Sequence, residues 1–269
     1  MGSVENTAVT KGAVIFAVGT MAIDYAAMAA WSADRISRFL HLPTTLITDQ
    51  DIVDSVFDQV IRITTAPSEC TRWFDDFDQS VPWHNLDRCD ALDLSPYDRT
   101  LLLDADYVIN SGQLRTIVDH DRFWCHRHTY TVGTCQINDH FGRHRHPMYW
   151  ATAIAFGRDV QSAFIFDSMR MIRNNWQHYR DLYHIDNALF RNDYALSIAL
   201  PLVNGHVQPP RLPGAMMNVM PEHGLRQIEE DSFEVTWRCS QGRSYTNLLK
   251  DLDFHAMCKR DLGVIVAAH

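Results

Sequence analysis

Lysine is scarce in this chain of 269 residues. Only three of its 24 cationic side chains are lysines, namely Lys11, Lys250 and Lys259, and the formal net charge is −9. This balance argues against a generally basic surface for nucleic acid. Arginine suits planar contacts to phosphate better than lysine does, although codon usage in a GC-rich genome accounts for the same bias.

Paired cysteines and long apolar runs are missing as well. None of the six cysteines forms a CxxC pair, and their spacing indicates neither a disulfide framework nor a zinc site. Apolar stretches such as residues 13–18 fall far short of the ~20 residues that span a bilayer. Residues 1–11 lack the pattern of a signal peptide. We therefore expect reduced thiols and a cytoplasmic location, which is the host cytoplasm for a phage-encoded protein.

Short apolar segments alternate with helical patterns along the first part of the chain. This β-α-β order predicts an α/β fold with a mostly parallel central sheet flanked by helices. Strands are expected at residues 12–19, 44–49, 59–63, 99–103, 148–156 and 233–237. Helices are expected at residues 25–39, 86–92, 160–180 and 186–196, with a loop region at 64–84.

No repeat or linker divides the sequence. We expect one domain over residues 1–269, with an inserted excursion at about 122–147 and an irregular part from about residue 200. The excursion is dense in arginine, histidine and aromatic residues, and the last part is rich in proline.

The most informative stretch is a leucine-rich strand that ends on Asp104-Ala105-Asp106. Ligands of open α/β sheets bind beyond the carboxyl ends of the strands. Carboxylates at that edge are placed to hold Mg²⁺ or Mn²⁺, which prefer oxygen ligands and often share them with substrate phosphates. The alternative is a solvent-exposed turn at the strand end whose two acids bind no metal.

This block resembles the D-x-D motif of GT-A glycosyltransferases, especially the retaining group that includes glycogenin and the lipooligosaccharide galactosyltransferases. The resemblance covers roughly residues 12–200 and 253–259. It implies a GT-A fold and a hexosyl- or pentosyltransferase that uses a UDP-sugar with Mn²⁺ or Mg²⁺. In it Asp104 and Asp106 bind the metal, Asp104 and Ala105 contact the donor, and Asp106 is also a catalytic residue.

The resemblance also implies a set of donor contacts. Arg88, sixteen residues before Asp104, takes the place of a basic residue that contacts the donor. The residues after the first strand would approach the ribose and base, and Tyr25 would stack on the base. These residues are Ala17, Val18, Gly19 and Thr20. A surface arginine and a packed tyrosine are the structural alternatives for Arg88 and Tyr25.

Two further parts of the family pattern have partial counterparts. His255 resembles the third metal ligand, and Lys259 resembles the lysine that contacts the diphosphate, although the spacing between them is shorter than in the family. Asp186, expected at a helix start, resembles the acid beside the sugar, and it suits a helix cap equally well. Thr152 occupies a strand that faces the sugar in the family.

The reaction implied is transfer of a sugar to an acceptor hydroxyl. A retaining enzyme needs no dedicated base, because a phosphate oxygen takes the proton, whereas in an inverting enzyme Asp186 is the candidate base. Arginines interleaved with aromatic rings at 122–146, among them Arg127, Arg143 and Arg145, are consistent with a nucleic acid that carries hydroxymethylated bases. The alternative is a saccharide, lipid or protein acceptor.

Two other functional classes compete with this interpretation. A sugar nucleotidyltransferase shares the sheet and the metal, but it would carry a glycine-rich loop with Arg and Lys where residues 19–25 lack one. A non-catalytic nucleotide-sugar binding protein is the other rival, and it would not need two acids at a strand end.

Overall fold

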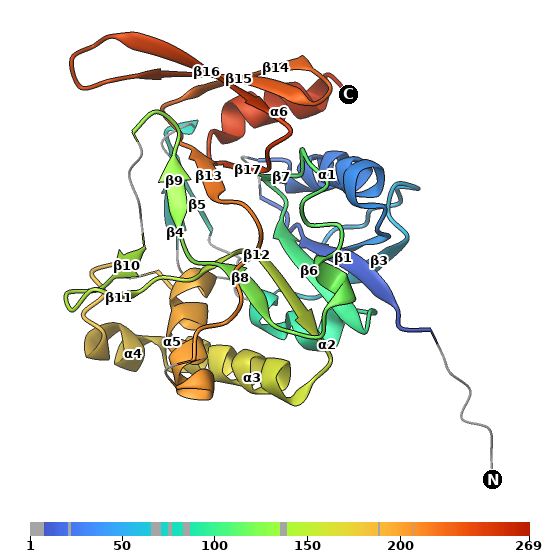
Figure 1. Cartoon of the computed structure of the whole chain (residues 1–269), viewed down its shortest axis with the longest axis vertical. Coiled ribbons are helices and arrows are strands. Elements are labelled where there is room, and N and C mark those ends of the chain that lie inside the picture. The colour runs from blue at the N-terminus through green and yellow to red at the C-terminus, as the bar shows by residue number, and fades with distance from the viewer. Residues whose placement is uncertain are drawn as a thin grey trace.

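The computed structural model describes residues 8–20, 23–65, 71–74, 77–82, 87–134, 139–187, 189–205 and 207–269. Its central sheet has six strands in the order β3-β2-β1-β6-β12-β8 (Figure 1). They are β1 (Lys11–Phe16), β2 (Thr44–Thr48), β3 (Gln59–Arg62), β6 (Arg99–Asp104), β8 (Trp124–His126) and β12 (Trp150–Gly157). The first four are parallel, and β12 runs antiparallel to β6 and β8.

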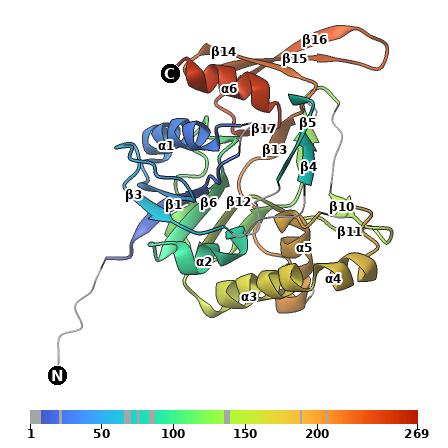
Figure 2. The ribbon, with the colours of Figure 1, turned by 180° about the vertical axis from the view of Figure 1, so that it is seen from behind.

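Helices cover both faces of this sheet. On one face α1 (Tyr25–Leu40) packs beside α6 (Lys259–Ala267); on the other lie α2 (Ala91–Leu94), α3 (Val160–Asn174) and α5 (Asn192–Asn204) (Figures 1 and 2). The predicted α/β class, with a mostly parallel central sheet flanked by helices, is confirmed.

Burial on both faces explains the composition of the central strands. A sheet sandwiched between helices needs nearly continuous apolar runs, and Leu101, Leu102 and Leu103 of β6 are at most 1 % exposed. Gly12 of β1 leaves space for a neighbouring aromatic ring, because a Cβ there would lie 2.2 Å from the ring of Tyr97. These strands form a rigid base whose carboxyl ends carry the acids.

The remaining strands form smaller sheets. One has the order β7-β17-β13-β9, with β7 (Tyr107–Val108), β9 (Thr129–Thr131), β13 (Met216–Val219) and β17 (Phe254–Ala256). Another is an antiparallel meander of β14 (Gly224–Glu229), β15 (Ser232–Arg238) and β16 (Ser244–Lys250). Two hairpins pair β4 (Thr71–Phe74) with β5 (Gln79–Pro82), and β10 (His140–Phe141) with β11 (His146–Pro147).

Several expected segments differ from those observed. The loop expected at 64–84 contains the β4–β5 hairpin, and the irregular part from residue 200 contains β13–β17 and α6. The 122–147 segment supplies β8 to the central sheet. The single helix expected over 160–180 is divided at Asn175 into α3 and α4 (Trp176–Leu182). The helix expected from 186 begins only at Asn192.

Short helical turns complete the chain. They are η2 (Asp87–Asp90) and η3 (Ile117–Asp119). The four cysteines that the structure describes, Cys89, Cys125, Cys239 and Cys258, are free thiols. Among the described residues, no helix combines the length and apolar character needed to cross a bilayer.

Candidate active site

Two carboxylates lie where the central sheet ends. Asp104 is the last residue of β6, opposite Phe16 at the end of β1, and a two-residue turn then leads through buried Ala105 to Asp106 and β7. Asp106 is only 7 % exposed. The apolar run of β6 fixes the position of Asp104, because this strand is held on both sides by β1 and β12. Asp106 follows in the turn between β6 and β7.

The antiparallel contact between β17 and β7 brings His255 to these acids. His255 is opposite Tyr107 in the register, and the amide of Ala256 donates a 2.9 Å hydrogen bond to the carbonyl of Asp106. Nε2 of His255 lies 3.3 Å from Oδ2 of Asp106. One ligand atom from each of Asp104, Asp106 and His255 lies within 4.8 Å of the others, and no other such group exists in the described part of the chain.

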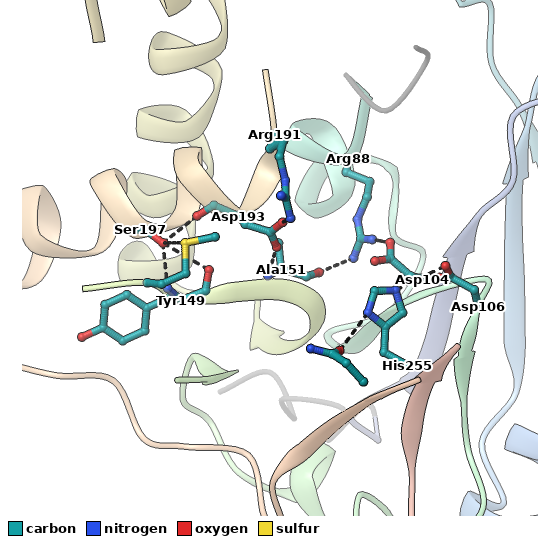
Figure 3. Close-up of polar contacts among 11 residues, drawn as sticks. Arg88, Asp104, Asp106, Tyr149, Ala151, Arg191, Asp193, Ser197 and His255 are labelled. Atoms are coloured by element: carbon teal, nitrogen blue, oxygen red, sulfur yellow. Dashed lines mark hydrogen bonds and ion pairs between the residues drawn. The ribbon is translucent and has the colours of Figure 1, made fainter. Parts of the chain in front are cut away.

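His255 is electrically neutral in this setting. Burial lowers its pKa from 6.5 to about 4, with Asp193 acting in the opposite direction. Its Nδ1 lies 3.3 Å from Oδ1 of Asn218 on the adjacent strand β13. Nε2 faces Asp106 (Figure 3), and a metal ion bound there would take the Nε2 lone pair while Asn218 accepts the proton of Nδ1. Two carboxylates and a neutral imidazole are a suitable ligand set for Mn²⁺ or Mg²⁺.

Arg88 comes from η2 and is almost completely buried beside Asp104. Its Nη1 forms an ion pair with Asp104, and its Nη2 donates a 2.5 Å hydrogen bond to the carbonyl of Ala151 on β12 (Figure 3). Burial lowers the pKa of Arg88 to about 10, so the side chain stays cationic at neutral pH. Residues 83–86, which precede η2, lie outside the described part of the chain.

Lys259 is the first residue of α6 and the second cation of the site. Its ammonium forms an ion pair with Oδ2 of Asp106 and donates a 3.0 Å hydrogen bond to the carbonyl of Ala256. Lys259 reaches Asp106 despite its short spacing from His255, because β17 ends and α6 begins beside Asp106. Each of the two acids is thus paired with one buried cationic side chain.

The expected donor segment follows β1. Ala17 is buried, whereas Val18, Gly19 and Thr20 are half-buried. The amide of Gly19 donates a 2.8 Å hydrogen bond to Asp49, and a Cβ on Gly19 would lie 3.1 Å from the side chain of Gln50. A side chain at position 19 would require Gln50 to shift slightly.

Tyr25 opens α1, whose N-terminus is capped by Asp24. It is half-buried, and burial raises its pKa to about 12. The roles of Tyr25 and of residues 17–20 at a nucleotide stay predictions.

Strand β12 begins at the same edge of the sheet. Because β12 is antiparallel to β6, its first residues lie beside the end of β6, which places buried Thr152 at the level of the acids. The neighbouring peptide of Ala151 is held from both sides: its carbonyl accepts from Arg88, and its amide donates a 2.9 Å hydrogen bond to Oδ1 of Asp193.

Asp193 is the acid that sequence reasoning missed. It lies in the first turn of α5, forms an ion pair with Arg191, and influences the pKa values of both Arg88 and His255 (Figure 3). The expectation that Asp186 begins a helix is wrong: Asp186 is exposed in the segment between α4 and α5, because α5 starts six residues later. The sequence signal that could have identified Asp193 is its position in the first turn of an apolar helix, where the helix dipole favours an acidic side chain.

The three arginines expected at an acceptor differ in their surroundings. Arg127 is half-buried, stacks over the ring of Tyr149 at 5.1 Å, and has two buried nitrogens without a hydrogen-bond partner among the described residues. Arg143 and Arg145 are exposed on the turn between β10 and β11. Among the described residues, no contact joins these three arginines to the acids. Their role in acceptor binding stays a prediction.

Comparison with known proteins gives distant structural likeness. No protein-family model matches the chain, and no curated protein matches its sequence. The glycosyltransferase GlyE of Streptococcus pneumoniae TIGR4 is 17 % identical with a TM-score of 0.43, over 76 % of this chain and 45 % of GlyE. A putative glucose-1-phosphate thymidylyltransferase from Bacillus anthracis is 10 % identical with a TM-score of 0.37, over 74 % and 97 % of the two chains.

A third similar structure is the bifunctional glycosyltransferase WbbM. It is 12 % identical with a TM-score of 0.34, over 63 % of this chain and 36 % of WbbM. This chain therefore matches less than half the length of both glycosyltransferases.

Proposed function

We propose that this protein is a metal-dependent glycosyltransferase of the GT-A type, which moves a sugar from a nucleotide-diphosphate donor, a UDP-sugar, to an acceptor hydroxyl. The observation that carries the proposal is the convergence of Asp104, Asp106 and His255 within 4.8 Å at the carboxyl edge of a mostly parallel sheet. Ligand sites of α/β sheets occur at this edge.

The residues present fit a divalent cation with a diphosphate. Three protein ligands leave coordination positions open for phosphate oxygens, and neutral His255 offers a lone pair at physiological pH. Bound Mn²⁺ or Mg²⁺ would neutralise charge on the departing diphosphate.

The chain adds its own electrostatic support. Arg88 and Lys259 are buried cations on either side of the acids, so both would stabilise negative charge in a place where water does not screen it. Ala17, Val18, Gly19, Thr20 and Tyr25 would bind the nucleoside, and Thr152 and Asp193 would orient the sugar. Asp186 stays the alternative acid if the reaction inverts configuration.

Two acceptor classes are compatible with this site. Exposed Arg143 and Arg145 suit a polyanion such as DNA with hydroxymethylated bases. A saccharide, lipid or protein hydroxyl is the competing class.

A donor screen tests the proposal. UDP- and GDP-sugars are incubated with the protein and Mn²⁺, and released nucleoside diphosphate is measured; parallel reactions with a nucleoside triphosphate and a sugar 1-phosphate are assayed for pyrophosphate. We expect metal-dependent release of UDP from the sugar donor. Pyrophosphate from the parallel reaction would instead identify a nucleotidyltransferase, and no product in either reaction would reject both enzymes.

Matched variants connect that activity to the acids. Asp106→Asn should lower UDP release by at least about 100-fold, since removing a preorganised electrostatic group typically costs 10²–10³. It should also abolish the rise in melting temperature caused by Mn²⁺ with UDP. Asp34→Asn, an exposed acid on α1, is the control and should behave as wild type.

A further inference from the structure

The hairpin of β4 and β5 lies next to the candidate active site. Figures 1 and 2 both show it beside β13, the strand that carries Asn218. Between its two strands, the ring of Phe77 lies 5.7 Å from the guanidinium carbon of Arg260, the residue that follows Lys259 on α6. These two observations place the hairpin against the elements that surround Asp106.

The register of the hairpin turns Arg72 toward the interior of the protein. Arg72 is directly opposite Val81 in the antiparallel pair, and directly opposed residues share one face of a sheet. Val81 is only 5 % exposed, whereas Trp73 and Ser80, the neighbouring pair on the other face, are exposed. Arg72, which is half-buried, therefore extends from the inner face of the hairpin.

The positive charge of Arg72 acts on two separate parts of the candidate site. Burial raises the pKa of Tyr25, and Arg72 acts in the opposite direction. Burial lowers the pKa of His255, and Arg72 is among the cations that lower it further. Because a charge perturbs a pKa strongly only at short range, the guanidinium lies near both side chains. Tyr25 opens α1 and His255 is on β17, so Arg72 connects two ends of the site.

A nucleotide-diphosphate donor would span the same two points. Its nucleoside would bind beside Tyr25 and its diphosphate would bind the metal beside His255, so the phosphates would pass close to Arg72. An arginine presents a planar fork of N–H donors that matches two phosphate oxygens. The inner face of the hairpin therefore offers the diphosphate a third cation, in addition to Arg88 and Lys259.

We propose that Arg72 is a further donor-binding residue, which donates hydrogen bonds to the diphosphate from the inner face of the β4–β5 hairpin. This role rests on the proposed glycosyltransferase function. None of the donor contacts expected from the sequence comes from this hairpin, because residues 64–84 were expected to form a loop. The hairpin would form one wall of the donor site and would shield the phosphates from water on that side.

A series of nucleotides with different numbers of phosphates tests the proposal. Uridine, UMP and UDP are titrated into the full chain in excess Mn²⁺, and dissociation constants are measured by calorimetry. Wild type should bind more tightly with each added phosphate. Arg72→Gln should lower the affinity for UDP about 10- to 100-fold, the usual cost of losing a hydrogen bond to a charged group. The affinity of this variant for uridine, which has no phosphate, should equal that of wild type.

Two further variants separate the contribution of the fork from that of the charge. Arg72→Lys keeps the positive charge but loses the planar fork, so it should retain only part of the affinity for UDP. Arg226→Gln is the charge-matched control. Arg226 is exposed on β14, where it forms an ion pair with Glu234, and its variant should bind all three ligands as wild type does.

Two results would overturn the role of Arg72 and leave the proposed function standing. The first is equal affinity of Arg72→Gln and wild type for UDP. The second is an equal loss of affinity for uridine and UDP in Arg72→Gln, which would mean that Arg72 supports the fold and not the phosphates. A wild-type protein that binds uridine and UDP equally would refute the proposed function as well, so the two failures are distinguishable.

Discussion

Lys259 forms an ion pair with the same oxygen of Asp106, Oδ2, that lies 3.3 Å from Nε2 of His255. The ammonium therefore lies against a carboxylate that the proposed metal would also use. Two cations this close repel each other strongly in a poorly solvated site. Lys259 and the metal thus compete for Asp106 unless a diphosphate attracts Lys259 elsewhere.

This competition predicts coupled binding of metal and nucleotide. In Lys259→Met, Mn²⁺ alone should bind about five- to tenfold more tightly, whereas UDP should bind the Mn²⁺-loaded protein more weakly, since coupling free energies of this size are typical of linked sites. Calorimetric titration of each ligand, alone and with the other, measures both effects. Lys250→Met is the control, because Lys250 is exposed on β16. Weaker binding of Mn²⁺ alone by Lys259→Met would contradict the competition.

Asn218 should act as a positioning residue for His255. Its Oδ1 lies 3.3 Å from Nδ1 of His255, and loss of such a partner commonly lowers metal affinity about 10–100-fold. We expect Asn218→Ala to lower Mn²⁺ affinity by that amount and Asn218→Asp, which keeps an acceptor oxygen, to retain most of it. Manganese affinity measured by electron paramagnetic resonance is the readout, and equal affinity in Asn218→Ala would exclude the role.

Asp193 and Asp186 offer a direct comparison of two candidate acids. Asp193 contacts the Ala151 peptide beside Arg88, whereas Asp186 is exposed before α5. We expect Asp193→Asn to lower kcat about 100-fold with Mn²⁺ affinity little changed, a loss in the range for groups that act on the reacting atoms. Asp186→Asn should stay near wild type. The reverse ranking would restore Asp186 as the acid beside the sugar.

The central fold was predictable because its signals are local. The apolar runs of β1, β2 and β6 separated by the amphipathic α1 are sufficient to predict the parallel sheet, and the acids at the end of β6 followed from the same run. The position of Asp193 was not predictable in this way. Asp186 suits a helix cap by residue type, but α5 begins at Asn192, and the boundary depends on packing of α5 against α3 and β12.

Contacts between distant segments account for the other differences. Strand β17 pairs with β13, where Asn218 and His255 are 37 positions apart, and with β7, which directly follows Asp106; Asp106 and His255 are 149 positions apart. This pairing is what brings Asn218 and His255 to Asp106. No period in the sequence encodes such register. Strand β15 was expected at 233–237, whereas β13, β14 and β16 were missed because prolines at positions 209, 210, 213 and 221 surround or precede them. Proline is a turn signal that says nothing of the strand that follows.

Exposed Arg143 and Arg145 separate the two acceptor classes. If DNA is the acceptor, replacing both by alanine should weaken binding of a duplex and reduce the slope of log affinity against log salt by about 1–2, since each phosphate contact contributes about 0.9. Fluorescence anisotropy at several salt concentrations measures this slope. A saccharide, lipid or protein acceptor predicts no change in DNA binding, and the exposed pair Arg226 and Arg243 serves as a charge-matched control.

His126 should make the fold sensitive to mild acid. It is 2 % exposed, its Nε2 lies 3.2 Å from the hydroxyl of Tyr107, and burial lowers its pKa from 6.5 to about 4. Between these two values the unfolded chain binds more protons at this histidine than the folded chain does. The free energy of unfolding must therefore fall as the pH is lowered through this window, by roughly 2 kcal/mol between pH 7 and pH 5.

A substitution isolates this contribution from that of His255, whose pKa is lowered in the same direction. His126→Gln keeps an amide near the Tyr107 hydroxyl but cannot take up a proton, so its unfolding free energy should lose about half of the wild-type change between pH 7 and pH 5. Urea denaturation at the two pH values measures the difference. His178→Gln on α4, where no buried histidine is removed, should keep the full wild-type change; an equally steep dependence in His126→Gln would mean that His126 is already protonated in the folded protein at pH 5.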